Sequence, residues 1–133
     1  MGRAEDGKAR PIRSVHINGQ VVRALFDTGS VRSYIRSGLA GGLPRARIRK
    51  PVAVGFGGRV HHLRNTCLVE VELEGQPFDF QAYPIPRIGQ DEKGEEIDIL
   101  IGATALEQWG LIIDPRTGRI DTRRLKRREF TEY

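Results

Sequence analysis

The sequence predicts a mostly-β domain, and three observations favour this class. The chain has 133 residues, which is enough for one hydrophobic core and short for two. Its 16 glycines and 7 prolines divide it into short apolar segments, most of which alternate with the period of two that is typical of strands. Only residues 103–110 have a clear helical pattern, so strands do not alternate with long helices. A compact barrel or sandwich is therefore predicted.

The first half of the chain predicts two hairpins with an irregular segment between them. In residues 12–26, Asn18 and Gly19 separate two apolar runs, and Asn-Gly favours the positive φ angles of a type I′ turn. Residues 33–43 are expected to hold one helical turn or irregular structure. Residues 47–63 predict two strands around a glycine-rich bend.

The second half predicts two more hairpins, a loop, a buried strand and the helix. Residues 65–85 alternate on both sides of a Glu-Gly turn, and residues 86–98 form a polar, charged loop. The apolar run at 97–102 predicts a short buried strand. The predicted helix over 103–110 places the apolar residues Ala103, Leu106 and Trp109 at a spacing of three and ends at Gly110. Residues 111–125 predict a closing hairpin around Asp-Pro and Thr-Gly.

Composition excludes several classes of protein. Hydrophobic residues make up 38% of the chain and charged residues 29%, as in an ordinary soluble domain. No segment approaches the roughly 18 consecutive apolar residues of a membrane helix. The charged residues 1–11 are expected to form a flexible segment and not a secretory signal. The single Cys67 is expected to be a buried strand residue and suits a reducing compartment, so a cytoplasmic location without membrane attachment is expected.

The net charge of +5 comes partly from a basic C-terminal tail, residues 123–133. Such a run can bind nucleic acid. A solvated terminal segment is favoured instead, because Phe130 and Tyr133 are the only aromatic residues there that could stack on bases.

The stretch Asp27-Thr28-Gly29-Ser30 directly follows an apolar run. These four residues alone favour a simple turn, because each is a common turn former. A carboxylate at the end of a buried strand is costly unless it is hydrogen-bonded or paired, so a catalytic role is the alternative.

The order of three motifs decides between these two interpretations. The sequence LFDTGS (25–30) is followed by the glycine-rich bend VGFGG (54–58) and then by ILIGATAL (99–106). With these motifs the chain resembles the retropepsin-like aspartic proteases over residues 12–122. The resemblance implies a single-lobe, acid-protease-type closed β-barrel with one short C-terminal helix.

The resemblance also implies a role for each motif. Asp27 is the expected catalytic carboxylate, Thr28 is expected to hydrogen-bond to a partner loop, and Gly29 allows two backbones to approach closely. The remaining expected site residues are Gly55, Phe56, Gly57 and Gly58 in a mobile flap, and Ile101 and Gly102 in a core segment behind the active loop.

The mechanism of this family needs two carboxylates that share one proton. The chain carries one such motif, since Asp121-Thr122-Arg123 lacks the glycine. An obligate C2 homodimer is therefore expected, acting as an aspartic endopeptidase on extended polypeptides without a cofactor. The Ala103 that follows Gly102 departs from the arginine found in retroviral members, so the dimer must be braced differently.

Two further expectations concern Ser30 and the histidines. If the Ser30 hydroxyl donates to Asp27, it favours the ionised carboxylate and an acidic pH optimum. His61 and His62 are adjacent on a strand and point to opposite faces, so no metal site is expected.

Two alternatives stay open. One is a catalytically silent protease fold that serves as a dimerisation or binding module. The other, less favoured, is a basic β-domain that binds nucleic acid.

Overall fold

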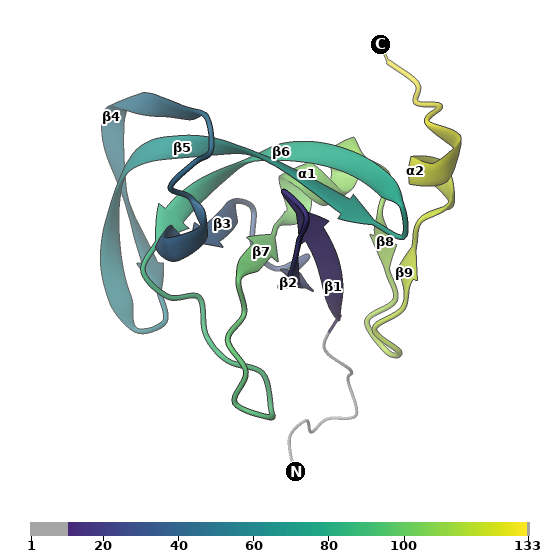
Figure 1. Cartoon of the computed structure of the whole chain (residues 1–133), viewed down its shortest axis with the longest axis horizontal. Coiled ribbons are helices and arrows are strands. Elements are labelled where there is room, and N and C mark those ends of the chain that lie inside the picture. The colour runs from purple at the N-terminus through teal and green to yellow at the C-terminus, as the bar shows by residue number, and fades with distance from the viewer. Residues whose placement is uncertain (1–10, 133) are drawn as a thin grey trace.

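The computed structural model describes residues 11–132, and its main feature is a seven-stranded sheet (Figure 1). The strand order is β1-β2-β7-β3-β6-β5-β4. The strands are β1 (Ile12–Ile17), β2 (Gln20–Phe26), β3 (Ser33–Arg36), β4 (Arg45–Phe56), β5 (Arg59–Leu73), β6 (Gln76–Ile85) and β7 (Ile99–Ile101). A two-stranded sheet of β8 (Ile112–Ile113) and β9 (Ile120–Asp121), a 3-10 helix η1 (Ser37–Leu39) and the helices α1 (Ala103–Gln108) and α2 (Arg123–Arg127) complete the chain. The mostly-β class is confirmed, while residues 1–10 of the expected flexible segment lie outside the described residues.

The predicted hairpins are present, and their turns show why the sequence specifies them. The β1–β2 turn has φ angles of 50° at Asn18 and 77° at Gly19. The β4–β5 turn places Gly57 and Gly58 at 59° and 77°. Both residues of such a turn need positive φ, which glycine and asparagine adopt at least cost.

Three elements differ from the expectation. Of residues 33–43, expected to hold one helical turn or irregular structure, 33–36 instead form β3, which pairs with both β6 and β7, while 37–39 form one helical turn as η1. Residues 59–73 form one long strand instead of separate pieces. The expectation of a single helix is wrong, because α2 follows β9 within the basic segment.

Two parallel strand pairs connect distant parts of the chain. β2 lies parallel to β7, with Phe26 opposite Ile101, and β3 lies parallel to β6. β1 pairs with β2 along its length and also with β5, where His16 lies opposite Glu72. The sheet therefore folds back so that β1, at one end of the strand order, meets the second strand from the other end.

The side chains of the sheet form two apolar clusters, one on each face of β2. The larger cluster contains Phe26, Cys67 and the helix residues Leu106 and Leu125. Burial there raises the pKa of the Cys67 thiol. The second cluster, called here the cleft cluster, contains Leu25, Tyr34, Leu63, Ile85, Ile97 and Leu100, with Phe56 packed against it.

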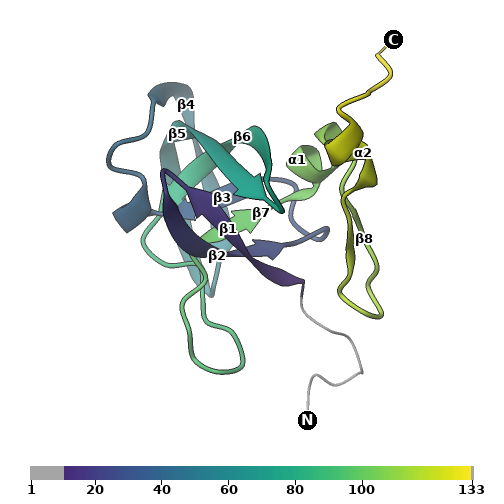
Figure 2. The same ribbon diagram turned by 45° about the vertical axis from the view of Figure 1, so that its right-hand side comes forward.

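The C-terminal segment packs on the domain beside α1 (Figure 2). Leu125 of α2 is fully buried, and Lys126 pairs with Glu74 at 2.9 Å. The guanidinium of Arg128 lies 5.3 Å from the centre of the Trp109 ring. Among residues 11–132, no helix has the length and apolar character needed to span a membrane.

Candidate active site

The backbone of Asp27 is fixed at the end of β2. Its N–H donates to the carbonyl oxygen of Ile101 at 2.9 Å, which continues the parallel pairing of β2 with β7 beyond the strand itself. The expected core segment at 99–102 therefore does lie directly beside the Asp27 loop. The sequence brings these two segments together because the paired parts of both strands, Ala24–Phe26 and Ile99–Ile101, are apolar and buried.

The loop after Asp27 holds one oxygen of its carboxylate. The Gly29 N–H donates to Asp27 Oδ1 at 2.8 Å, and the Ser30 N–H donates to the Asp27 carbonyl at 3.3 Å. Asp27 is half-buried, while Thr28 and Gly29 are exposed. Within residues 11–132, no donor is hydrogen-bonded to Asp27 Oδ2. One carboxylate oxygen is thus oriented and the other is free to meet water or a second acid.

Gly102 lies where the two loops interlock. A Cβ atom on Gly102 would stand 2.2 Å from the carbonyl oxygen of Arg32 and 2.6 Å from that of Ser30. The Ala103 N–H donates to the Ser30 carbonyl at 2.6 Å. Only glycine fits this close backbone approach, which accounts for the glycine in the third motif.

Ser33 is a site residue that sequence reasoning missed. It is buried, and its Oγ accepts a hydrogen bond from the Gly102 N–H at 2.9 Å. A serine followed by Tyr34 and Ile35 in a short segment gave no signal, because β3 itself was not predicted. This bond fixes the backbone behind Asp27.

The structure corrects the expectation for Ser30. Its hydroxyl donates to the carbonyl oxygen of Arg32 at 2.8 Å, and not to the Asp27 carboxylate. The loop bends so that residues 30–32 close a local turn, which is a common use of a serine side chain in a loop.

The expected flap is the β4–β5 hairpin. The Phe56 ring packs 4.8 Å from the Tyr34 ring, measured between centroids, and so joins the cleft cluster. Leu25, two residues before Asp27, belongs to the same cluster. Burial raises the pKa of Tyr34, another residue that the sequence did not indicate. The hairpin and the Asp27 strand therefore border one continuous apolar region.

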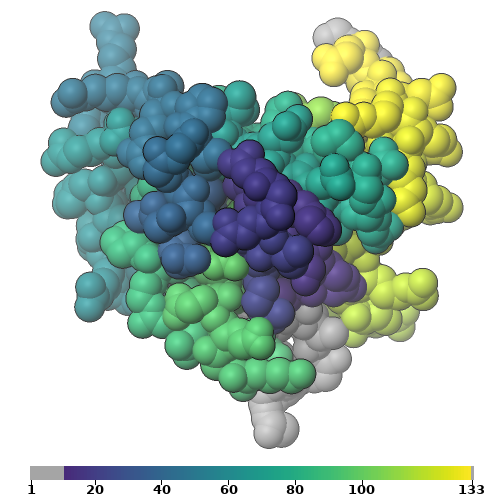
Figure 3. Space-filling view, in the orientation of Figure 1, coloured from purple at the N-terminus to yellow at the C-terminus, as the bar shows by residue number. Residues whose placement is uncertain are grey.

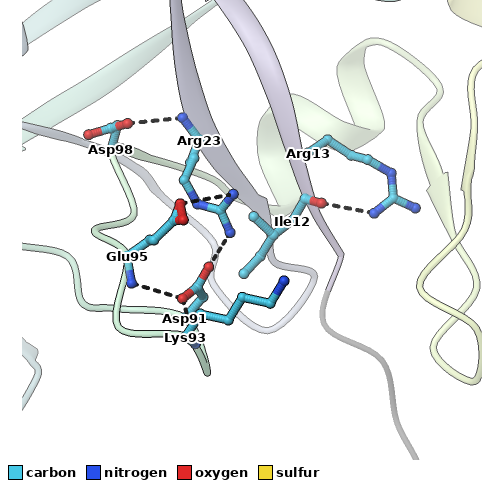
Figure 4. A network of polar contacts seen from close by, with 7 residues as sticks. All are labelled: Ile12, Arg13, Arg23, Asp91, Lys93, Glu95 and Asp98. Atoms are coloured by element: carbon cyan, nitrogen blue, oxygen red, sulfur yellow. Dashed lines mark hydrogen bonds and ion pairs between the residues drawn. The ribbon is translucent and has the colours of Figure 1, made fainter.

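Loop 86–98 is hydrogen-bonded to the strands that carry the site, and Figure 4 shows its contacts with Arg23 of β2. Asp98 Oδ2 accepts the backbone N–H of Arg23 on β2 at 2.9 Å. Asp98 Oδ1 accepts two bonds from the Arg36 guanidinium on β3, at 3.1 and 3.0 Å. The Arg23 guanidinium in turn pairs with Asp91 and, at 3.8 Å, with Glu95. One carboxylate thus joins both strands that flank β7.

The structure does not bring a second acid to Asp27 from the Asp121-Thr122-Arg123 segment. Asp121 instead pairs with Arg123 at 2.7 Å at the junction of β9 and α2.

The two neighbouring histidines lie on opposite faces of β5, because strand pairing places His61 opposite Val54 and His62 opposite Ala53 on β4. No group of three metal-ligating side chains occurs in residues 11–132.

Comparison with known families identifies the chain. A search of curated proteins gave no match. A family model described as aspartyl protease matches residues 14–105, which include the Asp27 loop, the β4–β5 hairpin, β7 and the start of α1. The matched region covers most of the chain and the three motifs except Leu106, the last residue of the third. The chain belongs to the retropepsin-like aspartyl proteases.

Proposed function

We propose that the protein is an aspartic endopeptidase that is active as a C2 homodimer. The observation that carries this proposal is the half-complete site, in which one oxygen of a single Asp27 carboxylate is held by Gly29 and the other receives no hydrogen bond from residues 11–132. The exposed Thr28 and Gly29 offer a surface on which a second copy of the same loop can pack. We also propose that the strands of each subunit form the closed barrel that the resemblance implies.

The chemistry requires both copies of Asp27. Two carboxylates at about 3 Å cannot both ionise cheaply, so the pair holds one proton between them. The ionised member takes a proton from a water molecule, which attacks the carbonyl carbon of the peptide bond. The protonated member donates to the carbonyl oxygen. The pair titrates as a unit, and neither apparent pKa belongs to one subunit.

In this proposal the β4–β5 hairpin acts as a flap that holds the substrate in an extended conformation. A polypeptide held between the hairpin and the floor of the site lies extended and pairs its backbone with neighbouring strands. Gly55, Gly57 and Gly58 leave the hairpin tip without side chains that would hinder its movement over the substrate. Phe56 and the edge of Leu25 are then available to contact substrate side chains, while Ile85 is buried beneath them.

The test uses a library of quenched fluorescent peptides and serial dilution of the protein. We expect cleavage that stops in Asp27→Asn, is blocked by a statine-type inhibitor, and loses specific activity on dilution below the dimer dissociation constant. Asp79→Asn, on β6, is the matched control and should retain activity. Activity per chain that stays constant down to a monomeric concentration would contradict the shared site.

Titrating the wild type with the Asp27→Asn variant separates this proposal from a silent binding module. If each site needs two aspartates, inactive heterodimers form and activity falls below the value expected from the wild-type fraction alone. A wild type that cleaves no peptide, and that dimerises as well as its Asp27→Asn variant, would support the binding module.

A further inference from the structure

A pocket of about 390 Å³ lies between the tip of the β4–β5 hairpin and the start of loop 86–98. Phe56 and Ile88 give it apolar walls, and Arg59, His61 and Arg87 supply its polar lining. The hairpin stands at the left of Figure 1, and Figure 3 shows loop 86–98 in green on the lower half of the same face. Two segments that are far apart in sequence thus form one site.

Strand pairing places the pocket on the face that borders the cleft cluster. Arg59 lies opposite Phe56, and His61 lies opposite Val54, so all four side chains share one face of the hairpin. The His61 ring lies 6.4 Å from the Phe56 ring, and Phe56 in turn contacts Tyr34. The pocket therefore continues the apolar region that contains Leu25.

The hairpin side of this pocket is positively charged, whereas loop 86–98 on its other side carries five carboxylates and two basic residues. From Thr28 to Val69 the chain has no aspartate or glutamate and eight lysines and arginines. Arg59 is exposed, and no carboxylate among the described residues pairs with it. Arg87 pairs with Glu96 at 2.7 Å, so this carboxylate neutralises one of the two guanidinium groups of the pocket. The pocket holds an uncompensated cation next to apolar walls.

We propose that this pocket binds an acidic side chain of the polypeptide substrate, so that the enzyme prefers Asp or Glu at one position near the cleaved bond. This inference rests on the proposed peptidase function. A guanidinium group binds a carboxylate with two parallel hydrogen bonds, and the apolar walls beside it offer a surface for the methylene groups of an acidic side chain. The pocket has room for one side chain, whereas a nucleic-acid strand needs a groove that follows its backbone.

Paired peptides that differ only by Glu or Gln at a single position test the preference. At one position we expect kcat/KM to be roughly tenfold higher for Glu, as a hydrogen bond to a charged group contributes. Arg59→Gln should remove this difference by lowering only the Glu value, and Arg59→Glu should favour a lysine peptide. Arg64→Gln is the matched control, because it removes the same charge from the opposite face of β5.

The outcomes separate this inference from the proposed function. Cleavage that never distinguishes Glu from Gln, or that responds equally to Arg59→Gln and Arg64→Gln, would overturn the pocket assignment alone. If no peptide is cleaved, fluorescence anisotropy with labelled Glu and Gln peptides still measures the preference as binding. A single-stranded RNA oligonucleotide that displaces the Glu peptide and loses affinity equally in both variants would also overturn it.

Discussion

At the scale of single residues, the site depends on positions where the gain or loss of one atom changes the stability of the Asp27 loop. The turn at Asp27-Thr28-Gly29 could be predicted from the local sequence, because polar turn formers follow an apolar run, whereas its expected catalytic role came from the resemblance to a family. Ser33 and the close approach at Gly102 were not predicted, because both depend on the loop at 30–33 meeting the β7–α1 junction. Contacts between segments about 70 positions apart leave no periodic signal in either one.

Gly102→Ala should destabilise the protein strongly. Its new Cβ atom would lie 2.2 Å from the Arg32 carbonyl oxygen, which belongs to the backbone and cannot rotate away. Overpacking of this kind costs about 1–3 kcal/mol of unfolding free energy, measured by urea denaturation. Gly42→Ala is the control, because an added Cβ there meets nothing within 4 Å. Equal stability of both variants would contradict the interlocked loops.

Ser30→Ala should leave the pH optimum of peptide cleavage unchanged. The hydroxyl donates to the Arg32 carbonyl and not to Asp27, so its removal alters no bond to the carboxylate. We expect a stability loss of about 1 kcal/mol from the broken loop bond. A pH–rate profile displaced toward neutral pH would show instead that the hydroxyl contacts the Asp27 pair in the active dimer.

At the scale of elements, loop 86–98 is more than a connection. Its polar composition correctly predicted a surface loop, yet Asp98 holds β2 and β3 together from outside the sheet. Composition shows where a loop occurs but not which strands its carboxylates reach.

Asp98→Asn should weaken the attachment of this loop. An amide accepts through one oxygen only, so it cannot serve both the Arg23 N–H and the Arg36 guanidinium. The expected loss is roughly 2 kcal/mol in urea unfolding, because hydrogen bonds to charged groups are involved. Glu92→Gln, an exposed change in the same loop, should have little effect. A similar loss of unfolding free energy in both variants would show that the net charge of the loop, and not the hydrogen bonds of Asp98, causes the effect.

The β9–α2 junction should make stability sensitive to acid. Hydrogen bonds from the Arg123 side chain and backbone lower the pKa of Asp121 to about 2, below its ordinary value of 3.8. A lowered folded-state pKa stabilises the fold above pH 3.8, and this contribution is lost as pH falls through about 2. Thermal unfolding between pH 5 and about pH 2 should therefore show a smaller fall in Tm for Asp121→Asn than for the wild type. Parallel curves would contradict this role.

At the scale of the whole molecule, local pairings were predictable and distant ones were not. The hairpins could be located because their turns and both strands lie within one stretch of sequence. The parallel pairs β2–β7 and β3–β6 and the β1–β5 contact join segments that lie 49 to 75 positions apart in the sequence. The resemblance to a family supplied the expectation that Ile101 and Gly102 lie behind the Asp27 loop, which the periodicity of the strands could not indicate.

The proposed dimer predicts a midpoint of thermal unfolding that depends on protein concentration. Association stabilises the folded chain by mass action, so Tm should rise with concentration when folding and dimerisation are coupled. Calorimetry over a hundredfold concentration range measures this. A constant Tm, together with monomeric mass in sedimentation at the highest concentration, would contradict the dimer.

The outer strand of the sheet has a consequence for handling the protein. β4 ends the strand order, so one side of its 12-residue backbone has no neighbouring strand among residues 11–132. Its pairing with β5 is interrupted between Arg47 and Val52, where Arg49, Lys50 and Pro51 are exposed. Charges, a proline and a break in register are the features that keep edge strands of separate molecules from joining. Replacing these three residues with β-branched ones should therefore increase aggregation, which light scattering would measure.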